Sequence, residues 1–326
     1  MASVFSYAFE PGFFSSGPVL TAAVVGGVAA VVSGVIGTFT VMRGQSFAGH
    51  ALSDVSAAGG SAAFLLGISP LLGFVGMGVL GAGSMELIGV RRAEGRDLAT
   101  GVVLGGGLGL TALLLYFDST SQSTTGAAIT VLFGSMFAIP SSSVPLVVAV
   151  SAVALVAVGV IYRPLLLSTL SPDLASVRGV RVRLVGVVYL VAMALAVALS
   201  ALTVGAILST ALLIGPAATA LRLTRRPARA VLVAAALGLA ATWLGIVLSY
   251  DSYYWSSSHR GWPVSFFVVS IIFLGYLVLR RPPRRRTAPA DVGDAPADGG
   301  DGATATATAT DGRHGLRGAA APGTAR

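Results

Sequence analysis

The chain has 326 residues, of which 55% are hydrophobic and only 10% are charged, so lipid must solvate most of it. It contains no cysteine, and all 21 of its basic residues are arginine, which excludes disulfides, thiol catalysis and the lysine-dependent chemistry of P-loops and Schiff bases. The net charge of +8 does not indicate nucleic-acid binding, because the arginines cluster at the ends of apolar segments.

Apolar segments of about 20 residues, the length that crosses a bilayer, alternate with short polar breaks. We therefore predict an all-α, polytopic membrane protein with about nine transmembrane helices. The apolar stretch 126–139 is too short to cross and is predicted to form a re-entrant or interfacial helix. The predicted spans are residues 18–42, 48–68, 70–90, 98–117, 143–162, 184–203, 204–221, 230–250 and 264–280.

The chain divides into three predicted regions. Residues 1–17 form an extracytoplasmic N-terminal segment, and residues 18–281 form the transmembrane domain. Residues 282–326 are rich in proline, alanine, aspartate and glycine, with a Thr-Ala repeat, and offer too little apolar surface to offset the entropy of ordering. We expect this last region to be a disordered cytoplasmic tail.

Four arginine-rich loops alternate with the predicted spans and are therefore expected in the cytoplasm. This arrangement places the N-terminus outside and the C-terminus inside. Aromatic residues in the loop 250–262 fall on the opposite side, where an interfacial aromatic belt is expected. The four arginine-rich loops are residues 91–97, 163–183, 222–229 and 280–286.

Ionisable side chains at hydrocarbon depth are costly, so each one is a candidate functional residue. His50 and Asp54 lie four residues apart in the second predicted span and therefore project from one helical face. An imidazole with one or two carboxylates suits zinc, manganese or ferrous iron. The spacing leaves two readings open, a cation site or a buried hydrogen-bonded pair.

Glu86 lies near the cytoplasmic end of the third predicted span. If that span runs antiparallel to the second, Glu86 falls at a depth similar to that of His50 and Asp54, and the three side chains can converge on one metal site. The other reading is a carboxylate at the membrane edge that pairs with an arginine such as Arg91.

Gly101, Gly105 and Gly109 repeat every four residues and form one smooth stripe along a predicted span. Small residues at this spacing let neighbouring helices approach closely. The stripe therefore indicates close helix packing.

The loop 163–183 contains a capped helix pattern, with a Ser-Pro-Asp start and a glycine stop. We predict a short helix facing the cytosol that includes Pro172, Asp173, Leu174 and Ala175 and ends at Gly179.

The apolar stretch 205–220 (GAILSTALLIGPAATA) contains Gly205 at its start and Pro216 near its end. A proline inside a helix releases a backbone carbonyl and kinks the helix. The stretch is therefore predicted either to pack as an ordinary span or to be a broken helix beside a transport pathway, with Gly205 and Pro216 as the helix-breaking residues.

Four segments together resemble the permease family of zinc and manganese ABC importers, over roughly residues 18–280. Residues 205–220 carry the most specific resemblance, to a glycine, an apolar run and Pro-Ala-Ala-Thr-Ala. Residues 43–54 (RGQSFAGHALSD) are similar to a family pattern in which the carboxylate precedes the histidine by four residues, whereas here His50 precedes Asp54. The other two segments are residues 95–102 (GRDLATGV) and 132–134 (LFG).

The resemblance implies a multi-pass permease in the bacterial cytoplasmic membrane that imports zinc, manganese or iron and performs no covalent chemistry. It implies two permease copies around a central path, cytoplasmic ABC ATPase subunits that hydrolyse ATP, and an extracytoplasmic metal-binding protein. The short helix Pro172–Gly179 would be the coupling helix that docks on the ATPase. No cofactor is expected, and ATP is expected only through the partner subunit.

Three alternatives remain open from the sequence. One is a secondary metal transporter driven by an ion gradient, for which embedded carboxylates and a broken helix are also expected. Another is an ABC permease for a metal chelate. The third is a membrane scaffold that transports nothing, in which His50 and Asp54 are purely structural. An enzyme is the least expected reading, because an intramembrane metalloprotease would need a motif such as HExxH, which is absent.

Overall fold

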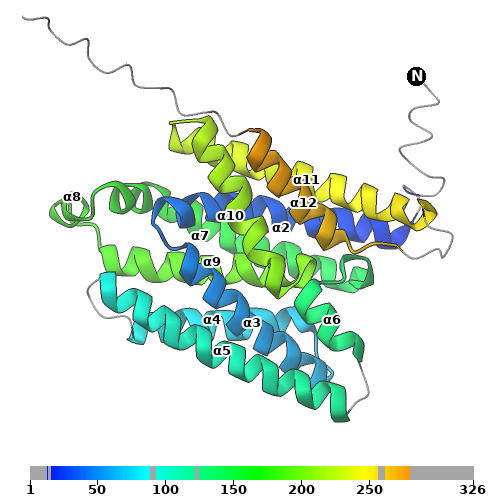
Figure 1. The fold of residues 1–326 in the computed structure, drawn as a ribbon. Coiled ribbons are helices and arrows are strands. Elements are labelled where there is room, and N and C mark those ends of the chain that lie inside the picture. Colours follow the sequence, from blue (N-terminus) through cyan, green and yellow to red (C-terminus); the bar gives the residue numbers. More distant parts are fainter. Residues whose placement is uncertain (1–12, 14–15, 89–92, 122–124, 256–260, 280–326) are drawn as a thin grey trace, which may run out of the picture. The chain divides into compact units, whose positions relative to one another are not determined.

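The computed structural model of the protein describes residue 13 and residues 16–88, 93–121, 125–255 and 261–279. This part of the chain consists of helices and contains no strand, which confirms the predicted all-α class (Figure 1). The α-helices are α2 (Gly17–Met42), α3 (Ser46–Leu66), α4 (Pro70–Ile88), α5 (Ala93–Ser121), α6 (Thr125–Phe133), α7 (Val144–Leu170), α8 (Pro172–Val177), α9 (Val182–Val204), α10 (Ala206–Leu223), α11 (Pro227–Trp255) and α12 (Val264–Val278), with short 3-10 turns η2 (Met136–Ala138) and η3 (Ser141–Ser143) before α7.

Seven helices in the described part of the chain are long and apolar enough to cross a membrane, so the predicted number of about nine is not confirmed. Each of the nine predicted segments is helical over most of its described residues, but α12 is only 15 residues long, and α3 has the length but not the hydropathy. The predicted short helix at 126–139 is found as α6 followed by η2.

The polarity of α3 is explained by its position between other helices. It packs against α4, α5, α9 and α10, and nearly all of its residues from Gly49 to Ser61 are buried (Figure 1). A helix that is sheltered by its neighbours need not present an apolar surface to lipid all round. This shelter is what allows four serines, His50 and Asp54 to lie on one membrane helix.

Two helices continue further than their apolar stretches predict. Helix α7 reaches Leu170, so Arg163 lies inside the helix and not in a loop, and α11 reaches Trp255, so the predicted loop 250–262 begins as helix. Hydropathy marks where a chain leaves the hydrocarbon, whereas a helix ends where its backbone hydrogen bonding ends. The predicted loop boundaries were wrong for this reason.

Helices α2 and α9 are the two most buried candidate spans and are joined by polar contacts. The Ser33 and Ser200 hydroxyls lie 2.6 Å apart, and the Thr40 hydroxyl lies 2.7 Å from that of Tyr189. All four side chains are buried. Buried hydroxyls need partners in a membrane interior, so these pairs fix how the two helices face each other.

Close helix packing is found at some of the glycines but not at the predicted stripe. A Cβ on Gly59 or on Gly73 would overlap the backbone of the other glycine, which places α3 and α4 in backbone contact. By contrast, a Cβ on Gly101, Gly105 or Gly109 would meet no atom of the described residues within 4 Å. The close packing predicted for that stripe is therefore wrong within this chain.

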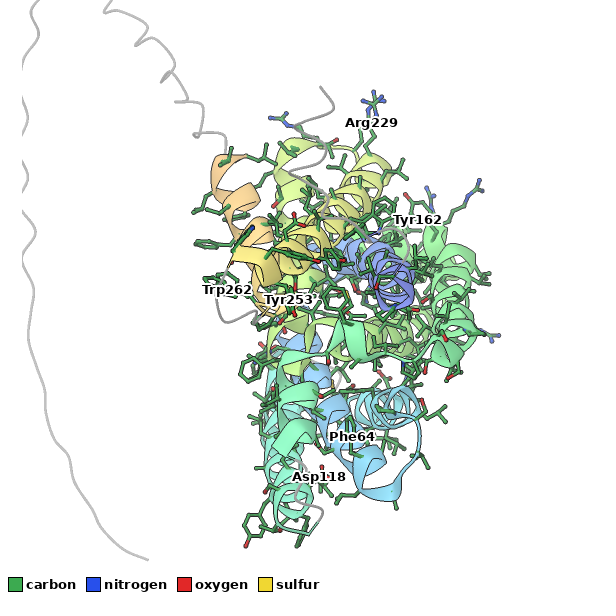
Figure 2. The ribbon with its side chains drawn as sticks, turned by 90° about the vertical axis from the view of Figure 1, so that its right-hand side faces the viewer. Phe64, Asp118, Tyr162, Arg229, Tyr253 and Trp262 are labelled. Carbon is green, nitrogen blue, oxygen red and sulfur yellow. The ribbon has the colours of Figure 1, made fainter. Side chains whose placement is uncertain are left out.

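Arginine-rich connections share one end of the helices. Helix α8 and the connection from α10 to α11 lie at the left of Figure 1, and the N-terminal ends of α2 and α12 lie at the right. Tyr253 and Trp262 belong to the right-hand end, are about half exposed, and lie near each other in Figure 2. The predicted topology requires the arginine-rich loops and the aromatic residues to lie at opposite ends of the helices, and they do. Which of the two ends faces the cytoplasm remains a prediction.

Candidate functional site

His50 and Asp54 face each other across one turn of α3. Nε2 of His50 lies 3.7 Å from Oδ2 of Asp54, because residues four apart in a continuous helix share a face. The imidazole is 45% exposed and the Asp54 side chain 10% exposed in the single chain. A nitrogen and an oxygen donor therefore lie side by side at an edge that a small cation can reach.

The second nitrogen of His50 contacts α10. Nδ1 lies 3.1 Å from Oγ1 of Thr210, within hydrogen-bond distance. Sequence reasoning did not identify Thr210, since the two residues are 160 positions apart. The one available signal was a Ser-Thr pair inside an otherwise apolar stretch.

Buried hydroxyls hold α3 against its neighbours beside the pair. Ser53 Oγ lies 2.7 Å from the carbonyl oxygen of Ala206 and 2.6 Å from the Ser209 hydroxyl, both on α10. From α5, Thr111 donates a hydrogen bond of 2.9 Å to the backbone carbonyl of Asp54. The helix that carries His50 and Asp54 is thus fixed on two sides.

Glu86 does not join this pair. Its carboxylate accepts a hydrogen bond of 3.0 Å from Nε of Arg183 on α9, and the described residues contain no group of three or more acidic or histidine side chains that could hold a metal. The predicted convergence of Glu86 with His50 and Asp54 is therefore wrong. The alternative, a carboxylate paired with an arginine, is what the structure shows, with Arg183 as the partner; Arg91 lies outside the described residues.

A cavity of about 690 Å³ opens beside the Glu86–Arg183 pair. Two arginines and two carboxylates line it, namely Arg43, Arg183, Glu86 and Asp97. Arg43 is held over the Tyr189 ring at 5.3 Å and donates hydrogen bonds of 3.2 Å to Ser168 and Thr169 at the end of α7. The described lining of this cavity therefore carries charges of both signs.

Gly205 separates α9 from α10, as predicted for a broken helix. Its φ of +95° is in a region that favours glycine, and α10 starts at the next residue. Pro216 behaves differently, because α10 runs through it without interruption from Ala206 to Leu223. The predicted break is therefore found at Gly205 and not at Pro216.

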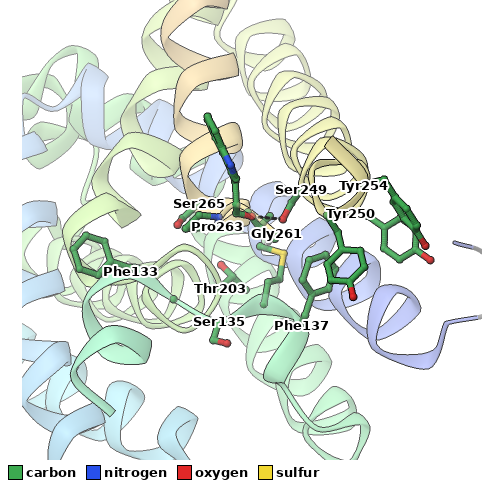
Figure 3. A pocket seen from close by; sticks show the side chains of 15 residues that line it. Phe133, Ser135, Phe137, Thr203, Ser249, Tyr250, Tyr254, Gly261, Pro263 and Ser265 are labelled. Carbon is green, nitrogen blue, oxygen red and sulfur yellow. Dashed lines mark hydrogen bonds between the residues drawn. The ribbon is translucent and has the colours of Figure 1, made fainter. Parts of the chain in front are cut away.

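A second cavity, of about 510 Å³, lies where the α6–η2 turn meets α11 and the start of α12 (Figure 3). Aromatic rings, including those of Phe133 and Tyr250, line it together with the hydroxyl-bearing residues Thr203 and Ser249. Ser249 lies 2.6 Å from the carbonyl oxygen of Trp262 and closes one wall. The described lining contains no charged side chain, so none of these described residues is a strong cation ligand.

The short helix predicted before Gly179 is α8 (Pro172–Val177). Asp173 lies in its first turn, Ala175 is buried, and Leu174 is 46% exposed. Gly179 has a φ of +77°, which reverses the chain towards α9. One side of α8 therefore packs against the rest of the protein, and its other side is exposed.

Several curated bacterial proteins are similar to this chain over most of its length. "Manganese transport system membrane protein MntC" of Listeria innocua is 27% identical, over 74% of this chain and 85% of the relative. The protein of the same name in Halalkalibacterium halodurans is 31% identical, over 71% of this chain and 78% of the relative. "Manganese import system permease protein ScaB" of Streptococcus pneumoniae is 30% identical, over 73% and 82%.

Two solved structures share the fold. "PsaBC from Streptococcus pneumoniae in complex with Fab" superposes with a TM-score of 0.70 at 24% identity, covering 86% of this chain and 95% of the solved one. "An inward-facing conformation of a putative metal-chelate type ABC transporter" gives a TM-score of 0.62 at 16% identity, covering 82% and 87%. At these identities the likeness concerns the fold alone.

The family model described as "ABC 3 transport family" matches residues 17–279, which include all of the helices from α2 to α12. The match covers the segments whose motifs suggested an ABC permease, and the relatives at 30% and 31% identity agree with it. The chain therefore belongs to the ABC 3 transport family.

Proposed function

We propose that this chain is the permease subunit of an ATP-driven importer that carries a divalent metal ion across the bacterial cytoplasmic membrane. Family membership supports the permease role, and the names of the relatives favour manganese over zinc or iron as cargo. The permease itself performs no covalent chemistry, and ATP acts through a separate subunit. The chain is oriented with its N-terminus outside and its C-terminus in the cytoplasm.

The observation that carries this proposal is the His50–Asp54 pair on α3. An imidazole nitrogen and a carboxylate oxygen suit manganese, zinc and ferrous iron alike. The pair offers fewer ligands than any of these ions takes in a tight site, and a transit site must release its ion as well as bind it. Water or a second permease copy supplies the remaining ligands.

The half-exposed edge of His50 is the part of the site that can face a path between two copies. In this arrangement two permease chains, identical or closely related, enclose the route of the ion. An extracytoplasmic metal-binding protein delivers the ion to the outer mouth. Glu86 has no ligand role in this proposal, because Arg183 already holds its carboxylate.

Helix α8 is the element that receives the ATPase. It lies at the arginine-rich end of the helices, its buried Ala175 fixes it to the membrane part, and Leu174 is open to a partner (Figure 1). Residues Pro172 to Gly179 thus form a short docking segment between α7 and α9, and movement of the ATPase pair is transmitted through it to these two helices.

Replacing either member of the pair tests the metal path. We expect His50→Ala and Asp54→Ala to abolish manganese uptake by intact cells while the protein still reaches the membrane. Ser61→Ala is the matched control, since Ser61 is also buried on α3 but bonds only to the carbonyl of Ala57. Normal uptake in both site variants would refute the site.

A secondary transporter is the competing mechanism, and energy supply separates the two. Uptake by the proposed importer should persist when an ionophore collapses the proton gradient and stop when cellular ATP is depleted. The reverse pattern would show that an ion gradient drives transport.

A further inference from the structure

The two nitrogens of His50 have different surroundings. Nε2 faces Oδ2 of Asp54 at 3.7 Å, and Nδ1 faces Oγ1 of Thr210 at 3.1 Å. A neutral imidazole carries one N–H and one lone pair, so only one of its nitrogens can bind a cation. The hydrogen-bond partner of the protonated nitrogen therefore decides which nitrogen is left to bind the cation.

A cation shared with Asp54 must use the lone pair of Nε2, because that nitrogen lies on the carboxylate side. The proton then sits on Nδ1 and needs an acceptor. The Thr210 hydroxyl is within reach and can accept, since a hydroxyl oxygen carries two lone pairs. We infer that Thr210 is a positioning residue that selects Nε2 of His50 as the metal-facing nitrogen; this inference rests on the proposed function.

The neighbouring contacts show why Thr210 can do this reliably. Ser53 bonds to both Ala206 and Ser209 in the first turn of α10, and all three residues are buried. These contacts fix the register of α3 against α10, so the next hydroxyl along α10 is held opposite the imidazole. Histidines that bind metals commonly donate their other N–H to a fixed oxygen, and loss of that oxygen typically weakens metal binding about 10–100-fold.

The test measures Mn²⁺ binding to the purified full-length chain in lipid nanodiscs by calorimetry. Thr210→Val keeps the side-chain shape and removes the acceptor, so we expect the Kd for Mn²⁺ to rise about 10–100-fold. Thr210→Ser restores the hydroxyl and should bind like the wild type. Ser61→Ala removes a buried hydroxyl of α3 that bonds to the carbonyl of Ala57 and takes no part in the contact with α10, so its Kd should be unchanged.

A wild-type Kd in Thr210→Val, or an equal loss in Thr210→Ser, would overturn the inference. If Thr210→Val does not reach the membrane, Thr210→Ala carries the same expectation. His50→Ala separates this inference from the proposed function. Loss of binding in His50→Ala with normal binding in Thr210→Val rejects only the positioning role, whereas wild-type binding in His50→Ala rejects the site itself.

Discussion

Gly134 and Gly205 meet backbone to backbone, although 71 residues separate them in the sequence. A Cβ on Gly134 would lie 2.5 Å from the carbonyl oxygen of Thr203, and a Cβ on Gly205 would overlap the peptide between Phe133 and Gly134. Both glycines have positive φ, +74° and +95°. The crossing thus joins the end of α6 to the break between α9 and α10.

We expect Gly134→Ala and Gly205→Ala to be strongly destabilising. The positive φ costs an alanine about 1–3 kcal/mol, and the obstructing atoms are backbone that cannot rotate away. Thermal unfolding of the purified chain in detergent checks this. Gly105→Ala is the control, because Gly105 is helical and a Cβ there meets nothing within 4 Å, so its melting temperature should be unchanged or higher. Equal melting temperatures for all three variants would contradict the crossing.

The Glu86–Arg183 pair is expected to matter much less for uptake than the His50–Asp54 pair. Arg183 is 81% exposed, and an exposed ion pair contributes only about 0–1 kcal/mol. Glu86→Gln should therefore retain most manganese uptake, whereas the matched change Asp54→Asn should remove it. If Glu86→Gln loses as much manganese uptake as Asp54→Asn, Glu86 takes part in ion transport and this prediction is wrong.

Changes in α8 should uncouple the permease from its ATPase without unfolding it. Leu174→Ala and Asp173→Ala truncate exposed side chains of α8, and Gly179→Ala strains the turn that closes it, because alanine is unfavourable at a φ of +77°. We expect the ATPase subunit to co-purify less with each variant, or its hydrolysis to continue without uptake. The control is Leu232→Ala, which truncates an even more exposed leucine on α11. Wild-type coupling in all three α8 variants would remove this helix from the mechanism.

Tyr189→Phe tests the polar contact between α2 and α9. The phenol lies 2.7 Å from the Thr40 hydroxyl and donates towards the carbonyl of Ile36 at 3.2 Å, and all of these groups are buried. Its loss should destabilise the chain by about 1 kcal/mol, seen as a lower melting temperature. Tyr116→Phe, at a side chain that is 62% exposed, should have no such effect. A shift of the same size in both variants would mean that the contact contributes nothing.

Local patterns in the sequence were enough to predict the helices and one pair of side chains. Apolar runs predicted nine segments that are all helical, and the four-residue spacing of His50 and Asp54 predicted their contact. The break at Gly205 and the short helix before Gly179 were also visible. Each of these features depends on residues within a few turns of one another, where helical geometry alone sets the distances.

Contacts between distant segments required the tertiary structure. Glu86 lies beside Arg183 and not beside Asp54, Thr210 meets His50, and Gly134 meets Gly205, because helix packing decides which faces touch. Packing also explains α3, which was predicted as a span but is more polar than the seven candidate spans, because four other helices pack around it. The sequence by itself therefore determined a helical membrane protein with one histidine–aspartate pair on a shared helical face. Only the fold decided what surrounds that pair, since no local period encodes the angle at which two helices cross.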